Sequence, residues 1–143
     1  MELTPVQPDS VSVNDSEIPT MRLGIGQTQW TVPGAIVEGM WQLGSEHLIA
    51  TTDDVPFEEG LHLCLLTADG TVDEEISVFS MYSTGTFELH GLSGPVLDFR
   101  FFDTPVWHLT VEPEKQLRLP FSGTLKGTRR KPIKLWSRLA LHE

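Results

Sequence analysis

The sequence has a single cysteine, few basic residues before position 115 and no long hydrophobic run. One cysteine, Cys64, excludes an intramolecular disulfide and a zinc site built from several thiolates. No apolar stretch approaches the ~20 residues that a membrane-spanning helix needs, and Met1 and Glu2 do not open a basic and apolar leader segment. These absences predict a cytoplasmic protein that does not bind membranes.

Apolar residues at helical spacing are also missing, whereas the chain contains 12 glycines and 10 prolines. From Met21 onward, short runs alternate apolar and polar residues and are separated by turn-forming residues. A hairpin is predicted where the run at 61–66 meets the run at 72–82 across a turn at 68–71. Short strands at regular spacing with polar residues outward predict an all-β fold, either an antiparallel β-sandwich of jelly-roll type or a closed barrel.

The length of 143 residues is typical of one domain. Residues 1–20 contain three prolines, several acidic or polar turn formers and no basic residue, a composition that buries little apolar surface. We therefore expect a disordered acidic tail at 1–20 and a single β-sandwich domain at 21–143.

Charge is distributed unevenly around the formal net charge of −10. Residues 1–114 contain nineteen acidic residues against only Arg22 and Arg100, whereas residues 115–143 contain eight basic residues and one acid. The basic segment either folds back on the acidic body or binds an acidic partner, because charges act locally at physiological salt. Nucleic acid is an improbable partner, because the basic residues form one short run rather than a stripe.

Trp136 lies within this basic segment. If 133–141 is a strand, Trp136 shares a face with Lys134 and Arg138 and points away from the leucines. An outward tryptophan flanked by cations predicts an interface anchor, although stacking on Arg138 or packing beneath the N-terminal tail are alternatives. The predicted partner-binding residues are Arg129, Arg130, Lys131, Lys134, Trp136 and Arg138.

Two alternative sites remain open. An acidic inhibitor or immunity-type protein would cover a basic site of its target with Asp53, Asp54, Glu58, Glu59, Asp73, Glu74 and Glu75. A small enzyme or sugar-binding domain would use polar side chains that share the outward parity of neighbouring strands, namely His62, His90, His108, Glu88, Asp98 and Arg100.

No known metal or phosphate motif occurs, so neither a metal nor a cofactor is expected. The sequence favours a non-catalytic interaction module that recognises a protein partner, or a second copy of itself, through the C-terminal basic–aromatic segment.

Overall fold

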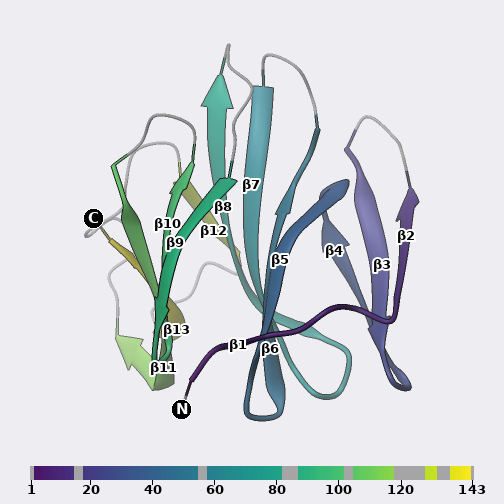
Figure 1. Cartoon of the computed structure of the whole chain (residues 1–143), viewed down its shortest axis with the longest axis horizontal. Helices are drawn as coiled ribbons and strands as arrows, with labels where there is room; N and C mark the ends of the chain where they lie inside the picture. The colour runs from purple at the N-terminus through teal and green to yellow at the C-terminus, as the bar shows by residue number, and fades with distance from the viewer. Residues whose placement is uncertain are drawn as a thin grey trace.

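A computed structural model describes residues 2–14, 18–54, 58–81, 87–101, 105–117, 128–131 and 136–142. For residues 58, 59, 80, 81, 115–117, 128–131 and 136 it describes the backbone alone. These residues form thirteen strands in three antiparallel sheets (Figure 1). The predicted all-β sandwich is confirmed, and none of the three sheets closes into a barrel within the described residues.

The largest sheet has six strands in the order β1 (Thr4–Pro5), β5 (Ile36–Leu43), β6 (Glu46–Thr52), β7 (Glu58–Leu66), β8 (Val72–Met81) and β12 (Thr128–Lys131). The second sheet has four, in the order β13 (Trp136–His142), β11 (Trp107–Leu117), β10 (Val96–Phe101) and β9 (Phe87–Ser93). The third has three, in the order β2 (Ser10–Asn14), β3 (Thr20–Ile25) and β4 (Thr28–Pro33).

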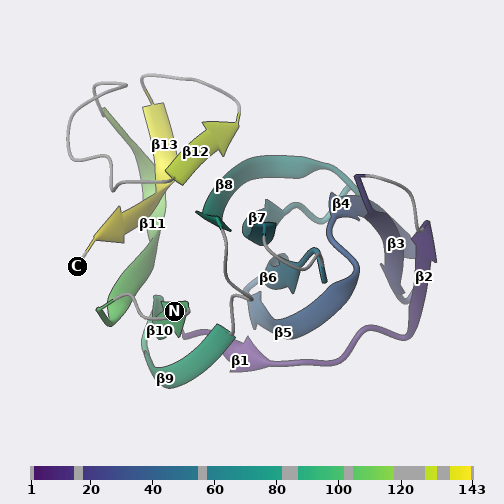
Figure 2. The ribbon, with the colours of Figure 1, turned by 90° about the horizontal axis from the view of Figure 1, so that it is seen from above.

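The six-stranded sheet is the middle layer, with the four-stranded sheet on one side and the three-stranded sheet on the other (Figure 2). Leu61, Leu63 and Leu65 of β7 pack in one core with Phe99 and other residues of the four-stranded sheet. A second, smaller core joins the opposite face of the middle sheet to the three-stranded sheet through Met21, Leu23, Trp30, Val32, Met40, Ile49, Cys64 and Leu66. Two separate cores therefore hold three layers together.

β7 shows how this layering differs from a simple sandwich. The alternation of Leu61, Leu63 and Leu65 on one face is as predicted, but every residue from 60 to 66 is buried. Antiparallel strands commonly leave one face in water, yet here the three-stranded sheet covers Cys64 and Leu66. Polar side chains of the middle sheet therefore reach solvent only in the parts that neither outer sheet covers.

The segment for which we expected a disordered tail contains two paired strands, and it contacts all three sheets (Figure 2). The Leu3 N–H donates to the Gly94 carbonyl at 2.9 Å, and β1 pairs with β5 of the middle sheet. The Asp9 N–H donates to the Gly24 carbonyl at 2.8 Å, and β2 then pairs with β3. We call residues 2–14 the N-terminal strap. Composition alone did not predict it, because backbone hydrogen bonds and the buried side chain of Leu3 hold the strap rather than a run of apolar residues.

Candidate functional site

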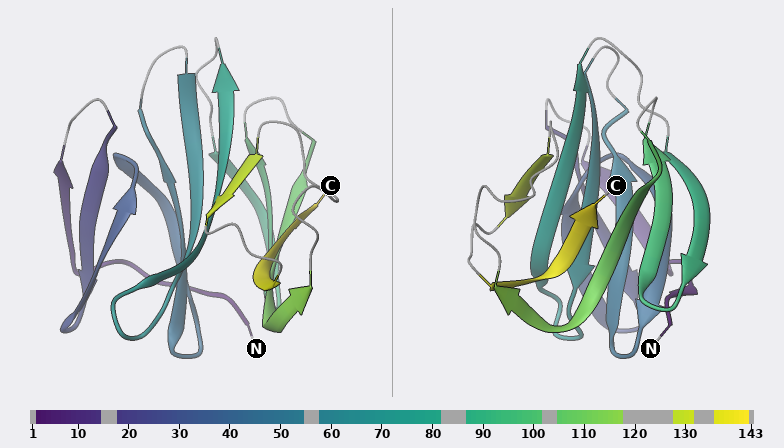
Figure 3. Two further views of the ribbon diagram at one scale, coloured as in Figure 1. Left: turned by 180° about the vertical axis from the view of Figure 1, so that it is seen from behind. Right: turned by 90° about the vertical axis from the view of Figure 1, so that its left-hand side faces the viewer.

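β12 is the last strand of the middle sheet and carries the three consecutive cations of the chain (Figure 3). It pairs with β8 so that Arg129 lies opposite Ser77 and Lys131 opposite Glu75. Within the described residues, no strand pairs with the other edge of β12. Lys134 and the side chains of Arg129, Arg130, Lys131 and Trp136 lie outside the description, so their contacts with a partner stay a prediction.

Arg138 on β13 is occupied within the molecule. Its Nη1 contacts both carboxylate oxygens of Glu46 at 2.6 Å, and its Nε donates to the Glu112 carbonyl at 2.9 Å. Only 14% of the Arg138 side chain is exposed. This residue therefore folds back on the acidic body, which is the alternative that the charge distribution left open, and its guanidinium is not free for a partner.

The predicted acidic surface is not one surface. Glu74 is buried, and its carboxylate accepts hydrogen bonds from the N–H groups of Arg138 at 2.7 Å and Leu139 at 3.2 Å. Asp54 is exposed, whereas Asp53, Asp73 and Glu75 are half-buried. The side chains of Glu58 and Glu59 lie outside the description. β8 places Glu74 between the two larger sheets because alternate residues of a strand point to opposite faces, so a run of acids cannot share one surface.

The best-organised polar cluster joins β7, β8 and Asp53, the residue after β6, through His62. Its Nδ1 lies 2.7 Å from the Ser77 hydroxyl, and its Nε2 lies 2.7 Å from Oδ1 of Asp53. An ionised Asp53 accepts from Nε2–H, which leaves Nδ1 to accept the Ser77 proton. This order of groups is that of a Ser–His–Asp triad.

The surroundings of Ser77 argue against nucleophilic catalysis. Ser77 lies within β8 rather than at a turn and is 4% exposed, and Glu75 Oε2, 3.3 Å from its hydroxyl, competes with His62 for the one hydroxyl proton. His62 is 6% exposed, and the Phe79 ring packs edge-on against it. A serine nucleophile needs an open approach, and the burial of Ser77 and His62 closes the approach at this position. The cluster serves instead to satisfy the polar groups of His62 and Ser77, which are buried where β7 and β8 pair.

We therefore expect Ser77 to be unreactive. Incubation of the folded protein with a fluorophosphonate probe should give no labelled adduct by intact-mass measurement, because the hydroxyl is enclosed and hydrogen-bonded on both sides. A Ser77→Ala variant is the matched control. Labelling of the wild type that disappears in this variant would show that the triad is a working active site.

The remaining predicted histidine-face residues lie on a different sheet from His62. Asp98 Oδ1 lies 2.5 Å from His108 Nδ1, and the His108 ring packs beside His142 at 5.6 Å on the outer face of the four-stranded sheet. On the same sheet, His90 Nε2 lies 3.5 Å from Glu88, and β9 places Glu88 opposite Arg100. The expectation that His62, His90 and His108 converge on one face is wrong, because strand parity predicts a face but not which sheet the strand joins. No metal-ligating group of three or more residues forms among the described residues.

Cys64 belongs to the smaller core and shows no sign of reactivity. Burial, with a smaller contribution from the nearby Glu75 carboxylate, raises the pKa of its thiol well above the usual range. The reactive thiolate is therefore disfavoured, and Cys64 acts as a small apolar residue of the core.

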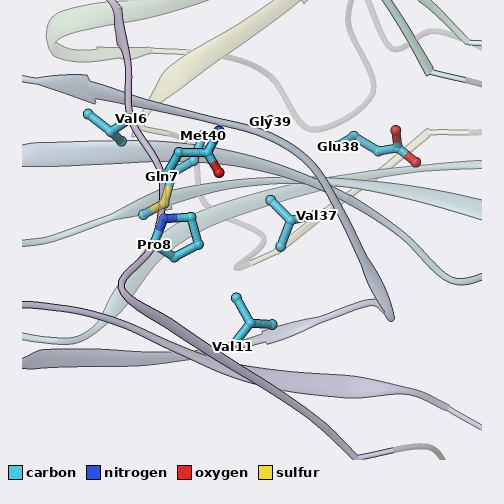
Figure 4. A pocket seen from close by; sticks show the side chains of 8 residues that line it. All are labelled: Val6, Gln7, Pro8, Val11, Val37, Glu38, Gly39 and Met40. Atoms are coloured by element: carbon cyan, nitrogen blue, oxygen red, sulfur yellow. The ribbon is translucent and has the colours of Figure 1, made fainter.

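A hollow of about 270 Å³ lies where the N-terminal strap passes β5 (Figure 4). The side chains of Val11, Val37 and Pro8 face the same space, whereas the Glu38 carboxylate lies apart from them. The other residues that line the hollow are Val6, Gln7, Gly39 and Met40. Sequence reasoning missed this site because half of its lining comes from the segment expected to be disordered.

Comparison with known proteins supplies no family, because protein-family models, curated proteins and solved structures give no significant match to this chain. The described residues include no helix long and apolar enough to span a membrane.

Proposed function

We propose that this chain is a non-catalytic protein-interaction module that binds an extended acidic segment along β12. The observation that carries the proposal is that the three consecutive cations lie on the terminal strand of the largest sheet. An edge strand presents backbone N–H and C=O groups to an incoming strand, and the cations select for acidic side chains on it.

The charge of the whole chain does not oppose this binding. The net charge of −10 repels an acidic partner at long range, but screening at physiological salt limits that repulsion to about 8 Å. Arg129, Arg130 and Lys131 thus act as local positive charges along one edge strand of an acidic body, and binding should weaken as salt rises. Burial of Glu74 removes one of the seven acids that an inhibitor would use to cover a basic site.

The other predicted residues divide into two roles. Arg138 holds β13 to the middle layer through Glu46 and is a positioning residue rather than a contact. Burial of Ser137 and Leu139 matches the strand parity that the sequence predicts for β13. Trp136, the first residue of β13, stays the proposed apolar anchor.

A labelled peptide of about eight alternating glutamates and threonines, a sequence that favours extended structure, is the probe for this site. In fluorescence anisotropy, the R129Q/R130Q/K131Q variant should bind this peptide at least about tenfold more weakly than wild type, because three charge-assisted contacts are lost. A peptide of the same sequence with N-methylated amides should also bind more weakly. Equal binding of the two peptides would exclude strand addition, and an unaffected triple variant would place the site elsewhere.

The Trp136→Ala variant tests the anchor separately. We expect the thermal midpoint to change little while the affinity for the acidic peptide falls by about tenfold or more, because interface tryptophans contribute about 2 kcal/mol or more to binding. Loss of the fold in this variant would mean that Trp136 belongs to the interior. Unchanged stability with unchanged affinity would remove Trp136 from the proposed site.

A further inference from the structure

We propose that the partner strand for β12 is the open edge of β5 in a second copy of the same chain. This inference rests on the proposed function, because it names the partner of that same strand. β12 and β5 lie toward opposite ends of the middle sheet, so the sheet would continue from one copy into the next (Figure 2).

The outer edge of β5 is open at residues 36–39. β1 pairs with β5 only at Trp41 and Gln42, and the Val6 N–H donates to the Met40 carbonyl at 2.9 Å. Beyond that point the strap turns away toward β2, and no described strand pairs with the outer side of residues 36–39. Four residues of β5 are left open, enough to pair with Thr128–Lys131, the described part of β12.

An exposed apolar surface adjoins this open edge. Ile36 is 41% exposed, Val11 46% and Val13 42%, and the 270 Å³ hollow lies between β5 and the strap. The aliphatic stems of arginine and lysine cover apolar surface while their charged ends stay in water. A basic strand lying along β5 would therefore bury apolar side chains that are now exposed to solvent.

The charges of the two edges are complementary. Glu38 is exposed on the open edge, where it accepts from the Thr52 hydroxyl at 2.8 Å, and Asp9 is exposed on the strap. The sequence has no lysine or arginine at 1–21 or 23–99. The bulge at Glu38 discourages pairing of two β5 edges, and the three cations discourage pairing of two β12 edges. Like charges oppose β12 against β12 and β5 against β5, whereas β12 against β5 brings opposite charges together.

Pairing of two different edges has a specific consequence for assembly. Each copy offers one edge of each kind, so association runs head to tail and is not limited to a symmetric pair. The interface is small and charged, so assembly should be weak, concentration-dependent and reduced by salt.

Two edge variants and their mixture test this arrangement by analytical ultracentrifugation. R129Q/R130Q/K131Q removes the basic edge, and Ile36→Lys places a cation on the acidic edge; Ile36 is exposed, so the fold should be retained. We expect the wild type to show at least a twofold rise in average mass as its concentration rises to about 1 mM, the range of weak association. Each variant alone should stay monomeric, and an equimolar mixture should form a one-to-one dimer and nothing larger. A Leu89→Lys variant on β9 is the matched control, because Leu89 is 48% exposed but lies on another sheet, and it should assemble as wild type does.

A wild type that stays monomeric throughout, or a mixture that forms no dimer, would overturn the inference. Self-association of either single variant would also overturn it, because that result requires pairing of like edges. Binding of the acidic peptide to monomeric protein distinguishes the two proposals: if the peptide binds β12 and no assembly occurs, the interaction module stands and the second copy is not its partner.

Discussion

Replacement of Glu74 by alanine should lower the free energy of unfolding by about 3 kcal/mol or more, because two buried N–H groups would lose their acceptor. The Glu74 side chain reaches from β8 to the N–H groups of Arg138 and Leu139 on β13, so one carboxylate joins the two larger sheets. The residue is 4% exposed, and water cannot easily replace the missing oxygens. Chemical denaturation followed by tryptophan fluorescence measures the change.

Glu74→Gln is the matched control for this prediction. Its carboxamide oxygen keeps one acceptor, so the loss should be smaller than for alanine, whereas Asp73→Ala on the same strand should change stability by less than about 1 kcal/mol. A Glu74→Ala protein as stable as wild type would mean that the contact between β8 and β13 contributes nothing to the fold.

Leu3→Ala should lower the free energy of unfolding by about 2–4 kcal/mol, the usual range for removing a buried leucine side chain. Leu3 is 5% exposed and packs in the larger core with Trp41 and residues of both sheets. The substitution also weakens the strap at the point where Leu3 bonds to Gly94. The same denaturation experiment gives the magnitude.

Thr4→Ala provides the control, because Thr4 is next to Leu3 but exposed. This substitution should change the free energy of unfolding by less than about 0.5 kcal/mol. A disordered tail would make both substitutions silent. Equal and negligible effects would therefore contradict the strap and restore the expectation drawn from composition.

The strands of the larger core were predictable from the sequence because the alternation of apolar and polar residues is visible within each strand. Leu97, Phe99 and Phe101 alternate with Asp98 and Arg100, and the same parity is buried in the structure. The prediction needs only the period of two along a strand.

The third layer was not predictable in the same way. Cys64 and Leu66 are consistent with an outward face in the sequence, and only their contact with the three-stranded sheet shows that this face is a second core. Nothing local in the sequence says which sheet a strand joins, so His62 and His108 share a predicted parity but lie on different sheets.

The candidate site was predictable in part. The basic run at 129–131 is evident from charge counting, and the structure adds that it lies on an edge strand. The role of Arg138 was not predictable, because its partner Glu46 is 92 residues away in the sequence.

Hydrogen–deuterium exchange during titration with the acidic peptide tests the central claim most directly. We expect slower exchange of backbone amides at 128–131 on saturation with the peptide, and no change at β9, an edge strand of the four-stranded sheet. Slower exchange at β9, or unchanged exchange at 128–131 with the peptide bound, would contradict binding by strand addition to β12.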